Sequence, residues 1–268
     1  ISSCSSNIYN KFDDPILVKN ILEVNDSIVK KDPVNLLIQP SPVNKFLGYP
    51  LGLAINNLAN DNPDEKFRIW LEKNENRYNR LEKLITSKQI DQLKRYNNSF
   101  NDFLKNIGQE PITINNTEID KNIERLKRFY DSKGYFDSNI TYDSIVEFNQ
   151  LTAKYSVETK ERYLIDSITV NIESKDLDSL YNANISRSQI KKGEFFTIDK
   201  LILERDRLIK LFKNNGIYNF QQRSINYQVL IDSTGNLKKI PIILNVKNID
   251  QETDYQIKKI DNINIFVE

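Results

Sequence analysis

The chain has 268 residues, 39% of them hydrophobic, and its 38 basic side chains balance 37 acidic ones for a net charge of +1. That length allows two or three domains with buried cores, while the near-zero charge produces no field that favours nucleic acid or anionic lipid. Histidine is absent and only one cysteine is present, which excludes histidine general bases, an internal disulfide and a thiolate metal cluster.

The single cysteine lies near the start of the chain, where Ile1, Ser2 and Ser3 precede Cys4. Small residues before a cysteine resemble the end of a bacterial lipoprotein signal, in which the cysteine is cleaved free and acylated. We therefore expect residues 1–13 to be a lipidated N-terminal tether, with a free thiol in a frayed terminus as the alternative. The serines after Cys4, where acidic residues mark lipoproteins exported to the surface in one bacterial phylum, favour a domain facing the periplasm.

Residues 14–160 are predicted to form a first module that opens with a strand over 16–24. An insertion at about 44–108 begins with an apolar run from Phe46 to Ile55, which glycine and proline interrupt and which is too short to span a bilayer. Two sets of apolar residues at helical spacing follow it, and they predict a helical hairpin that packs on itself and on the module. We expect Trp70 in the core. The sets are Phe67, Trp70, Leu71, Tyr78, Leu81, Leu84 and Ile85, then Ile90, Leu93, Tyr96, Phe100, Phe103 and Leu104.

The module continues with a predicted helix from a capping signal at Thr117 to Lys133, which ends at Gly134. A hairpin over 135–148 and 152–159 completes it. Residues 161–249 are predicted to form a second module, with a strand over 163–172, helices over 176–190 and 198–214, and strands over 218–231 and 238–246. Thr197 is a plausible N-cap for the second of these helices, and Ser233 to Asn236 supply the hairpin turn.

The two modules are repeats. When Gly134 is aligned with Gly216, the apolar positions of the preceding helices agree, for example Leu126 with Leu208. Both glycines are predicted to be structural, because each lets the chain turn from helix into strand. Residues 255–260 repeat the opening-strand pattern, so 250–268 are predicted to begin a third module.

The order β-α-α-β-β, with a helix ending in glycine and an aromatic residue, resembles the polypeptide-transport-associated (POTRA) domain. The residues that carry the resemblance are 126–136 and 208–218. The expected fold is therefore α+β, with tandem POTRA domains of three strands packed against two helices. Such domains precede the β-barrel of BamA/TamA-superfamily outer-membrane assembly proteins. Phe46 to Leu51, Ala54 to Leu58, Trp70 and Cys4 together are similar to TamL, the lipoprotein TamA homologue of Bacteroidota.

The resemblance implies a periplasmic region attached to the outer membrane, through the lipid anchor and a β-barrel that these residues do not contain. Its expected partners are a TamB-like periplasm-spanning protein and nascent outer-membrane proteins, with lipid as a possible cargo. A three-stranded sheet leaves strand edges open, to which an extended chain adds by β-augmentation. The candidate edges are the second strands of the modules, with Tyr135, Phe136, Ile140 and Tyr142 in the first and Ile217, Tyr218, Ile225 and Tyr227 in the second.

Catalysis is not expected. The acidic groups, the pair Asp13–Asp14 and the trio Asp61, Asp64 and Glu65, are expected in polar loops, and no glycine-rich phosphate loop occurs. No cofactor and no metal are predicted. The alternative function is a non-catalytic periplasmic scaffold, or a secretion-partner POTRA module with no role in barrel assembly.

Overall fold

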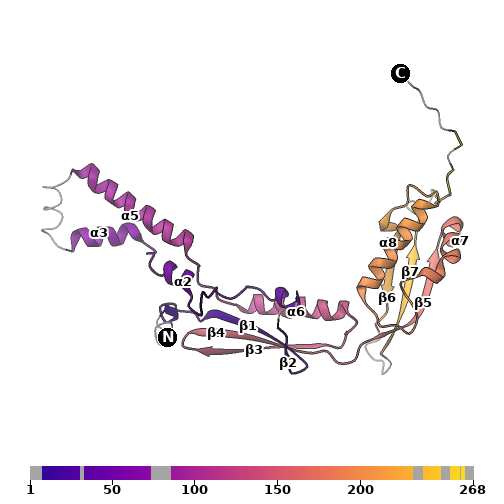
Figure 1. Cartoon of the computed structure of the whole chain (residues 1–268), viewed down its shortest axis with the longest axis horizontal. Helices are drawn as coiled ribbons and strands as arrows, with labels where there is room; N and C mark the ends of the chain where they lie inside the picture. The colour runs from indigo at the N-terminus through magenta and orange to yellow at the C-terminus, as the bar shows by residue number, and fades with distance from the viewer. Residues whose placement is uncertain are drawn as a thin grey trace, which may run out of the picture. The chain divides into compact units, whose positions relative to one another are not determined.

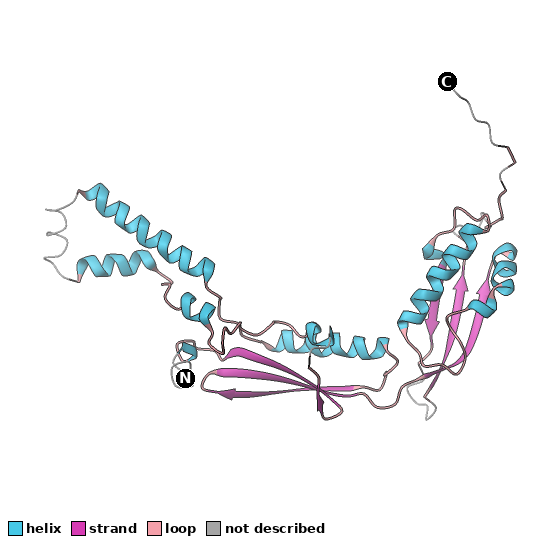
Figure 2. Ribbon diagram, viewed as in Figure 1, coloured by secondary structure: helices cyan, strands magenta, loops and turns pink. Residues whose placement is uncertain are grey.

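The computed structural model describes residues 8–30, 33–73, 86–231, 238–248, 254–259 and 261–262. The chain forms two compact units (Figure 1): unit 1 comprises Ile1–Leu126 and Ile140–Val157, and unit 2 comprises Lys127–Asn139 and Glu158–Glu268. Each unit contains one sheet with helices against it (Figure 2), which confirms the predicted α+β class.

The sheet of unit 1 has the order β2-β1-β4-β3, with β1 at Ile16–Val24, β2 at Ser27–Ile28, β3 at Asn139–Glu147 and β4 at Gln150–Glu158. β1 and β4 run parallel. The prediction of three strands was wrong by one, because the two-residue strand β2 folds back on β1. Asn25 and Asp26 make this reversal with φ angles of 47° and 63°, a conformation that these two residue types tolerate better than most.

The helix that precedes the hairpin, α6, covers Asn116–Ser132, so its last residues belong to unit 2. Its N-cap is Asn115, whose side-chain oxygen accepts a hydrogen bond from the Glu118 amide at 2.9 Å. The predicted cap at Thr117 was therefore two residues too late. Asn satisfies the same unpaired amides of a first helical turn as Thr does.

The insertion is helical, as predicted, with η1 at Pro33–Leu37 before it and α2 at Leu51–Asn56, α3 at Pro63–Glu72 and α5 at Ser87–Ile107 within it. α5 packs against both α2 and α3. The predicted burial was largely wrong. Trp70 is 46% exposed, and most of the large apolar residues of α5 face solvent, with Ile90 as the buried exception. Tyr78, Leu81, Leu84 and Ile85 lie outside the described residues.

Unit 2 confirms the predicted order β-α-α-β-β. It comprises β5 (Leu164–Ile172), α7 (Lys175–Ala183), η2 (Ile185–Arg187), α8 (Ile198–Asn214), η3 (Gln222–Ser224), β6 (Ile225–Val229) and β7 (Lys239–Val246). The sheet order is β5-β7-β6, with β5 parallel and β6 antiparallel to β7. Thr197 caps α8, as predicted, by accepting a hydrogen bond from the Lys200 amide. β6 is shorter than predicted because residues 218–224 form turns and the single turn η3.

The core of unit 2 joins both helices to the sheet, with Leu177 on α7, Phe212 on α8 and Leu244 on β7 among its buried members. Tyr255 belongs to this core, since its ring lies 5.0 Å from that of Phe220 and its side chain is 2% exposed. The described residues 254–259 are not assigned to a strand, and the start of a third module over 250–268 stays a prediction. Ile260 lies outside the described residues.

Both repeat glycines occupy turns that a side chain would disrupt. Gly134 and Gly216 have φ angles of 91° and 94°, in the region that favours glycine. A Cβ atom on Gly134 would lie 2.7 Å from the carbonyl oxygen of Phe196, and one on Gly216 would lie 2.7 Å from that of Lys258. The carbonyl groups of the two glycines accept hydrogen bonds from the amides of Tyr163 and Lys258 respectively.

Candidate strand-binding edges

The strand β3 is the outermost strand on its side of the unit 1 sheet, with β4 as its neighbour. β3 and β4 are joined by Phe148 and Asn149, whose φ angles are 50° and 61°. Two consecutive residues with positive φ between antiparallel strands form a type I′ turn. The Asn149 side chain also donates hydrogen bonds of 2.8 Å to the carbonyl oxygens of Tyr9 and Phe12, which fixes the turn to the N-terminal segment.

This turn determines which backbone groups of β3 face outward. The residues flanking a two-residue turn form a hydrogen-bonded pair, so Glu147 faces β4 and every second residue before it does the same. The Ile16 amide bonds to the Asn149 carbonyl at 2.9 Å, which places β1 on the other side of β4 in agreement with this alternation. The outward-facing backbone groups therefore belong to Ile140, Tyr142, Ser144 and Val146.

One of these outward amides already has a partner on its own strand. The amide of Ser144 donates a hydrogen bond of 2.8 Å to the carboxylate of Asp143. The second half of β3 also exposes apolar side chains, with Ile145 at 52% and Val146 at 49%. The edge thus offers main-chain groups together with apolar surface, which are the two ingredients of strand addition.

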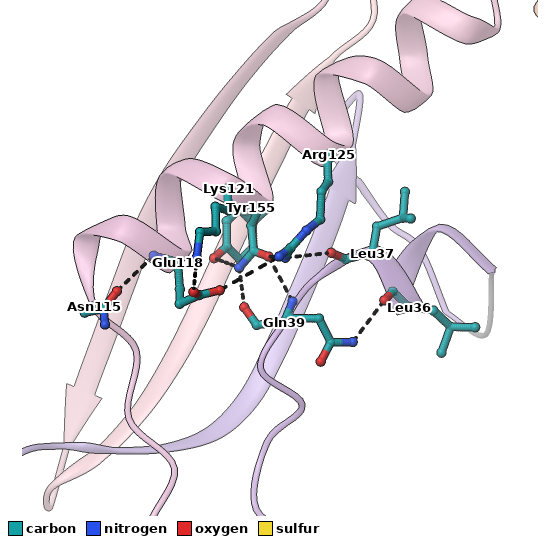
Figure 3. A network of polar contacts seen from close by, with 9 residues as sticks. Leu36, Leu37, Gln39, Asn115, Glu118, Lys121, Arg125 and Tyr155 are labelled. Atoms are coloured by element: carbon teal, nitrogen blue, oxygen red, sulfur yellow. Dashed lines mark hydrogen bonds and ion pairs between the residues drawn. The ribbon is translucent and has the colours of Figure 1, made fainter.

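The first half of β3 rests on a rigid support. The Tyr142 ring lies 5.2 Å from the ring of Tyr155 on β4, and Tyr155 is fully buried. The Tyr155 hydroxyl accepts a hydrogen bond of 2.8 Å from Asn122 on α6, which is itself bonded to the backbone of Gln39. Figure 3 shows Tyr155, Gln39 and Arg125 within this polar network. Arg125 adds a 2.7 Å bond to the Asn122 side chain. Burial raises the pKa of Tyr155, so its hydroxyl stays protonated.

The strand β6 is the corresponding edge of unit 2, and it is shorter. Ser224 and Leu230 bond to β7 through their backbone, so the alternate residues Ile225, Tyr227 and Val229 present their backbone groups outward. Ile225 is 4% exposed. The hydroxyl of Tyr227 is buried with no hydrogen-bond partner, and this burial raises the Tyr227 pKa. Because β6 has only five residues and its outward positions Ile225 and Tyr227 have buried side-chain atoms, it is the poorer edge for strand addition.

The structure separates the eight predicted edge residues into two groups. Ile140, Tyr142, Ile225 and Tyr227 lie on β3 and β6. Tyr135, Phe136, Ile217 and Tyr218 do not, because each pair falls in the turn before its strand. Ile217 is buried in the unit 2 core, and Phe136 packs against Tyr163 with ring centres 5.3 Å apart.

Sequence interpretation missed Ser144 and Val146, the outward positions of the exposed half of β3. A signal for them was present, since Phe148-Asn149 between two alternating runs would have set the alternation of the strand.

The remaining candidate residues show ordinary surface chemistry. Asp64 accepts a 2.7 Å hydrogen bond from Asn98, which holds the pKa of that carboxyl below its usual value, and Lys94 lies 3.3 Å away. The described residues contain no cluster of acidic or cysteine side chains able to hold a metal ion. None of their helices is long and apolar enough to cross a membrane. Cys4 lies outside the described residues.

Comparison with known proteins gives one clear sequence relative. The chain is 26% identical over 151 residues to the outer membrane protein assembly factor BamA of Buchnera aphidicola; the match covers 55% of this chain and 23% of that protein. The chain therefore spans about a quarter of its relative's length. No protein-family model matches it.

Among solved structures, the chain is similar to POTRA regions. For POTRA domains 3–5 of BamA from Haemophilus influenzae the identity is 10%, the coverage 87% of this chain and 96% of the other, and the TM-score 0.34. For POTRA domains 1–3 of Omp85 from Anabaena the identity is 12%, the match covers 88% of this chain and 67% of the other, and the TM-score is 0.27.

Proposed function

We propose that this chain is the periplasmic, partner-binding region of an outer-membrane protein assembly factor, and that it binds extended chains by adding them to β3. The sequence similarity to BamA supports the assembly role. The observation that carries the binding mode is the open edge of β3, with four outward-facing backbone positions beside exposed apolar side chains.

Strand addition suits a receptor for many clients because main-chain hydrogen bonds do not depend on the client's side chains. Each such bond contributes about 1 kcal/mol net, so a short strand on β3 binds weakly and leaves readily. Reversible capture is what the handling of unfolded outer-membrane chains requires.

The finer parts of the proposal are the anchor and the partners. We infer that Cys4 carries the lipid that holds the chain at the outer membrane, that a β-barrel lies beyond these residues, and that the TamL group is the nearest functional parallel. A TamB-like protein or an incoming outer-membrane protein would occupy the edge. The chain would act without catalysis, cofactor or metal.

The binding mode is tested by proline substitution at an outward position. Val146→Pro removes an amide that faces away from β4, and an edge strand tolerates proline there. Val146→Ala is the matched control, since it trims the side chain and keeps the amide. We expect the proline variant to bind a labelled peptide, taken from an outer-membrane β-strand, at least tenfold more weakly than the alanine variant. Thermal unfolding of the two should agree.

A second pair, Val229→Pro and Val229→Ala, applies the same test to β6. Loss of binding there, with Val146→Pro unaffected, would transfer the site to unit 2. Equal binding by all four variants would show that the chain does not bind by strand addition to β3 or β6. The anchor is tested separately by mass spectrometry of Cys4 in the native protein. A photo-crosslinker at position 146 would identify the bound partner in cells.

A further inference from the structure

The helix α5 has a second apolar face that nothing in the described structure covers. Five large side chains along it are between 44% and 73% exposed: Leu93, Tyr96, Phe100, Phe103 and Ile107. We call these five residues the α5 seam. Soluble monomers rarely expose a continuous apolar strip of this size without using it for binding.

The seam is separate from the face that α5 uses within unit 1. That inner face contains Ile90 and Asn101, which are 8% and 5% exposed. The Asn101 side chain donates a 2.9 Å hydrogen bond to the Asn60 carbonyl, which fixes the rotation of the helix. Since this contact is buried and polar, the seam cannot turn inward without breaking it.

The spacing of the seam identifies the shape of its partner. Its residues are separated by three, four, three and four positions, which is the a/d repeat of helices that pair side by side. The positions that flank such a seam hold no charged residue: they are Gln92, Asn97, Ser99, Leu104 and Asn106. Charges at these positions normally restrict partner choice, so this seam does not repel an identical helix.

Lipid fits less well. Helices that lie on a membrane carry a predominantly basic polar face. The polar side of α5 has four basic residues, Lys88, Lys94, Arg95 and Lys105, against Asp91 and Asp102. Two of the four are neutralised within unit 1, because Lys94 pairs with Asp64 and Lys105 with Asp61.

We propose that the α5 seam is a docking surface for a second copy of this chain, whose own α5 packs against it. At about 200 Å² for a large side chain, five that are roughly half exposed offer about 500 Å² per copy, hence about 1,000 Å² for the pair. That area lies at the low end for specific association. The dimer is therefore weak and reversible, and it forms where the chain is concentrated, as on a membrane surface.

The seam is tested by analytical ultracentrifugation of the full chain in water-based buffer. Cys4→Ser is included so that neither acylation nor a disulfide contributes. From about 1 to 300 µM protein, the mean mass should rise from monomer toward dimer. Phe100→Glu, at an exposed position where folding is not at risk, should raise the dissociation constant at least tenfold. Leu203→Glu is the matched control, because it makes the same kind of change at an exposed apolar position of α8, and it should leave the dimer intact.

Three outcomes would overturn the proposal: a monomer at every concentration, a dimer unaffected by Phe100→Glu, or equal loss in Leu203→Glu. Flotation with phosphatidylethanolamine–phosphatidylglycerol vesicles separates the lipid alternative. If the parent chain stays monomeric, and binds vesicles in a way that Phe100→Glu abolishes, the seam is a membrane surface instead. Circular dichroism of each variant shows that its fold is retained.

Discussion

The buried ion pair of α8 is the feature whose removal should cost unit 2 the most stability. Glu204 is fully buried and accepts two hydrogen bonds from Arg207, at 2.7 and 2.8 Å. It also accepts bonds from the Ser188 hydroxyl at 3.0 Å and the Gln189 amide at 2.8 Å. The carboxylate thus holds the segment before the second helix of the module against that helix. Glu204→Ala removes the acceptor of four hydrogen bonds, which are donated by Arg207, Ser188 and Gln189.

The size of the expected loss in stability follows from the burial of both Glu204 and Arg207. The Arg207 side chain is 16% exposed, so in the alanine variant its charge is left largely uncompensated, which costs about 3–5 kcal/mol. Glu204→Gln keeps the side-chain volume and one acceptor oxygen but leaves the same Arg207 charge without its counter-ion, so it should cost about 3 kcal/mol, the lower end of that range. Replacing both Glu204 and Arg207 by leucine should cost less than the sum of the two single leucine changes.

Because the chain has two units, the assay has to report on unit 2 alone. Hydrogen exchange of the Gln189 amide does so, since that amide is bonded to Glu204 itself. Exchange should accelerate strongly in Glu204→Ala, and the melting temperature of unit 2 should fall by about 10–20 °C. A loss below about 1 kcal/mol, or additive effects in the double variant, would refute the assignment of a coupled buried pair.

Three further changes test other parts of the structure. Gly134→Ala should destabilise unit 2 by at least about 2 kcal/mol in a melting assay, because its Cβ meets a backbone carbonyl. Gly193→Ala is the control: this glycine also has a positive φ but has open space around it, so its loss measures the backbone strain without the steric clash. The Lys238 ammonium, 2.6 Å from the Asp137 carboxylate, lowers the pKa of Asp137 from its usual 3.8. This ion pair therefore contributes about 1 kcal/mol to the stability of unit 2 above that pH, and the contribution is lost as the pH falls below it. Asp137→Asn should remove this acid sensitivity from pH-dependent unfolding curves, and an unchanged acid midpoint would contradict the assignment. Asn149→Ala should cost about 2–3 kcal/mol in urea unfolding, and Asn149→Gly, which tolerates the positive φ, only the part due to lost hydrogen bonds; equal losses would show that backbone strain is unimportant.

Local signals in the sequence predicted the elements well where periodicity and a terminal signal coincided. The helix from Ile198 to Asn214 has a Thr cap before it and a glycine stop after it, and it was predicted at its observed bounds. The strand from Ile16 to Val24 was equally clear. These features depend on residues within a few positions of one another, so the sequence contains all the necessary information.

The errors concern what covers an apolar face. Helical spacing shows that Trp70 and Phe100 lie on apolar stripes, but burial depends on a neighbour that local sequence does not specify. The contact of Tyr255 was missed for the same reason, because its ring packs into the core of unit 2, which the local strand-like pattern does not reveal. Four of the eight predicted edge residues, Tyr135, Phe136, Ile217 and Tyr218, precede their strands because a helix-to-strand turn occupies several residues after each glycine.

If extended chains add to β3 as proposed, the carboxylate of Asp143 makes that edge selective. A docking strand would have to displace this anion from the Ser144 amide before its own carbonyl could take that place. A docking strand with lysine or arginine opposite Asp143 would gain an ion pair that offsets the lost hydrogen bond, whereas an acidic or uncharged strand would gain none. On the same proposal, this one side chain would slow the addition of a partner strand and would also disfavour edge-to-edge association between free copies.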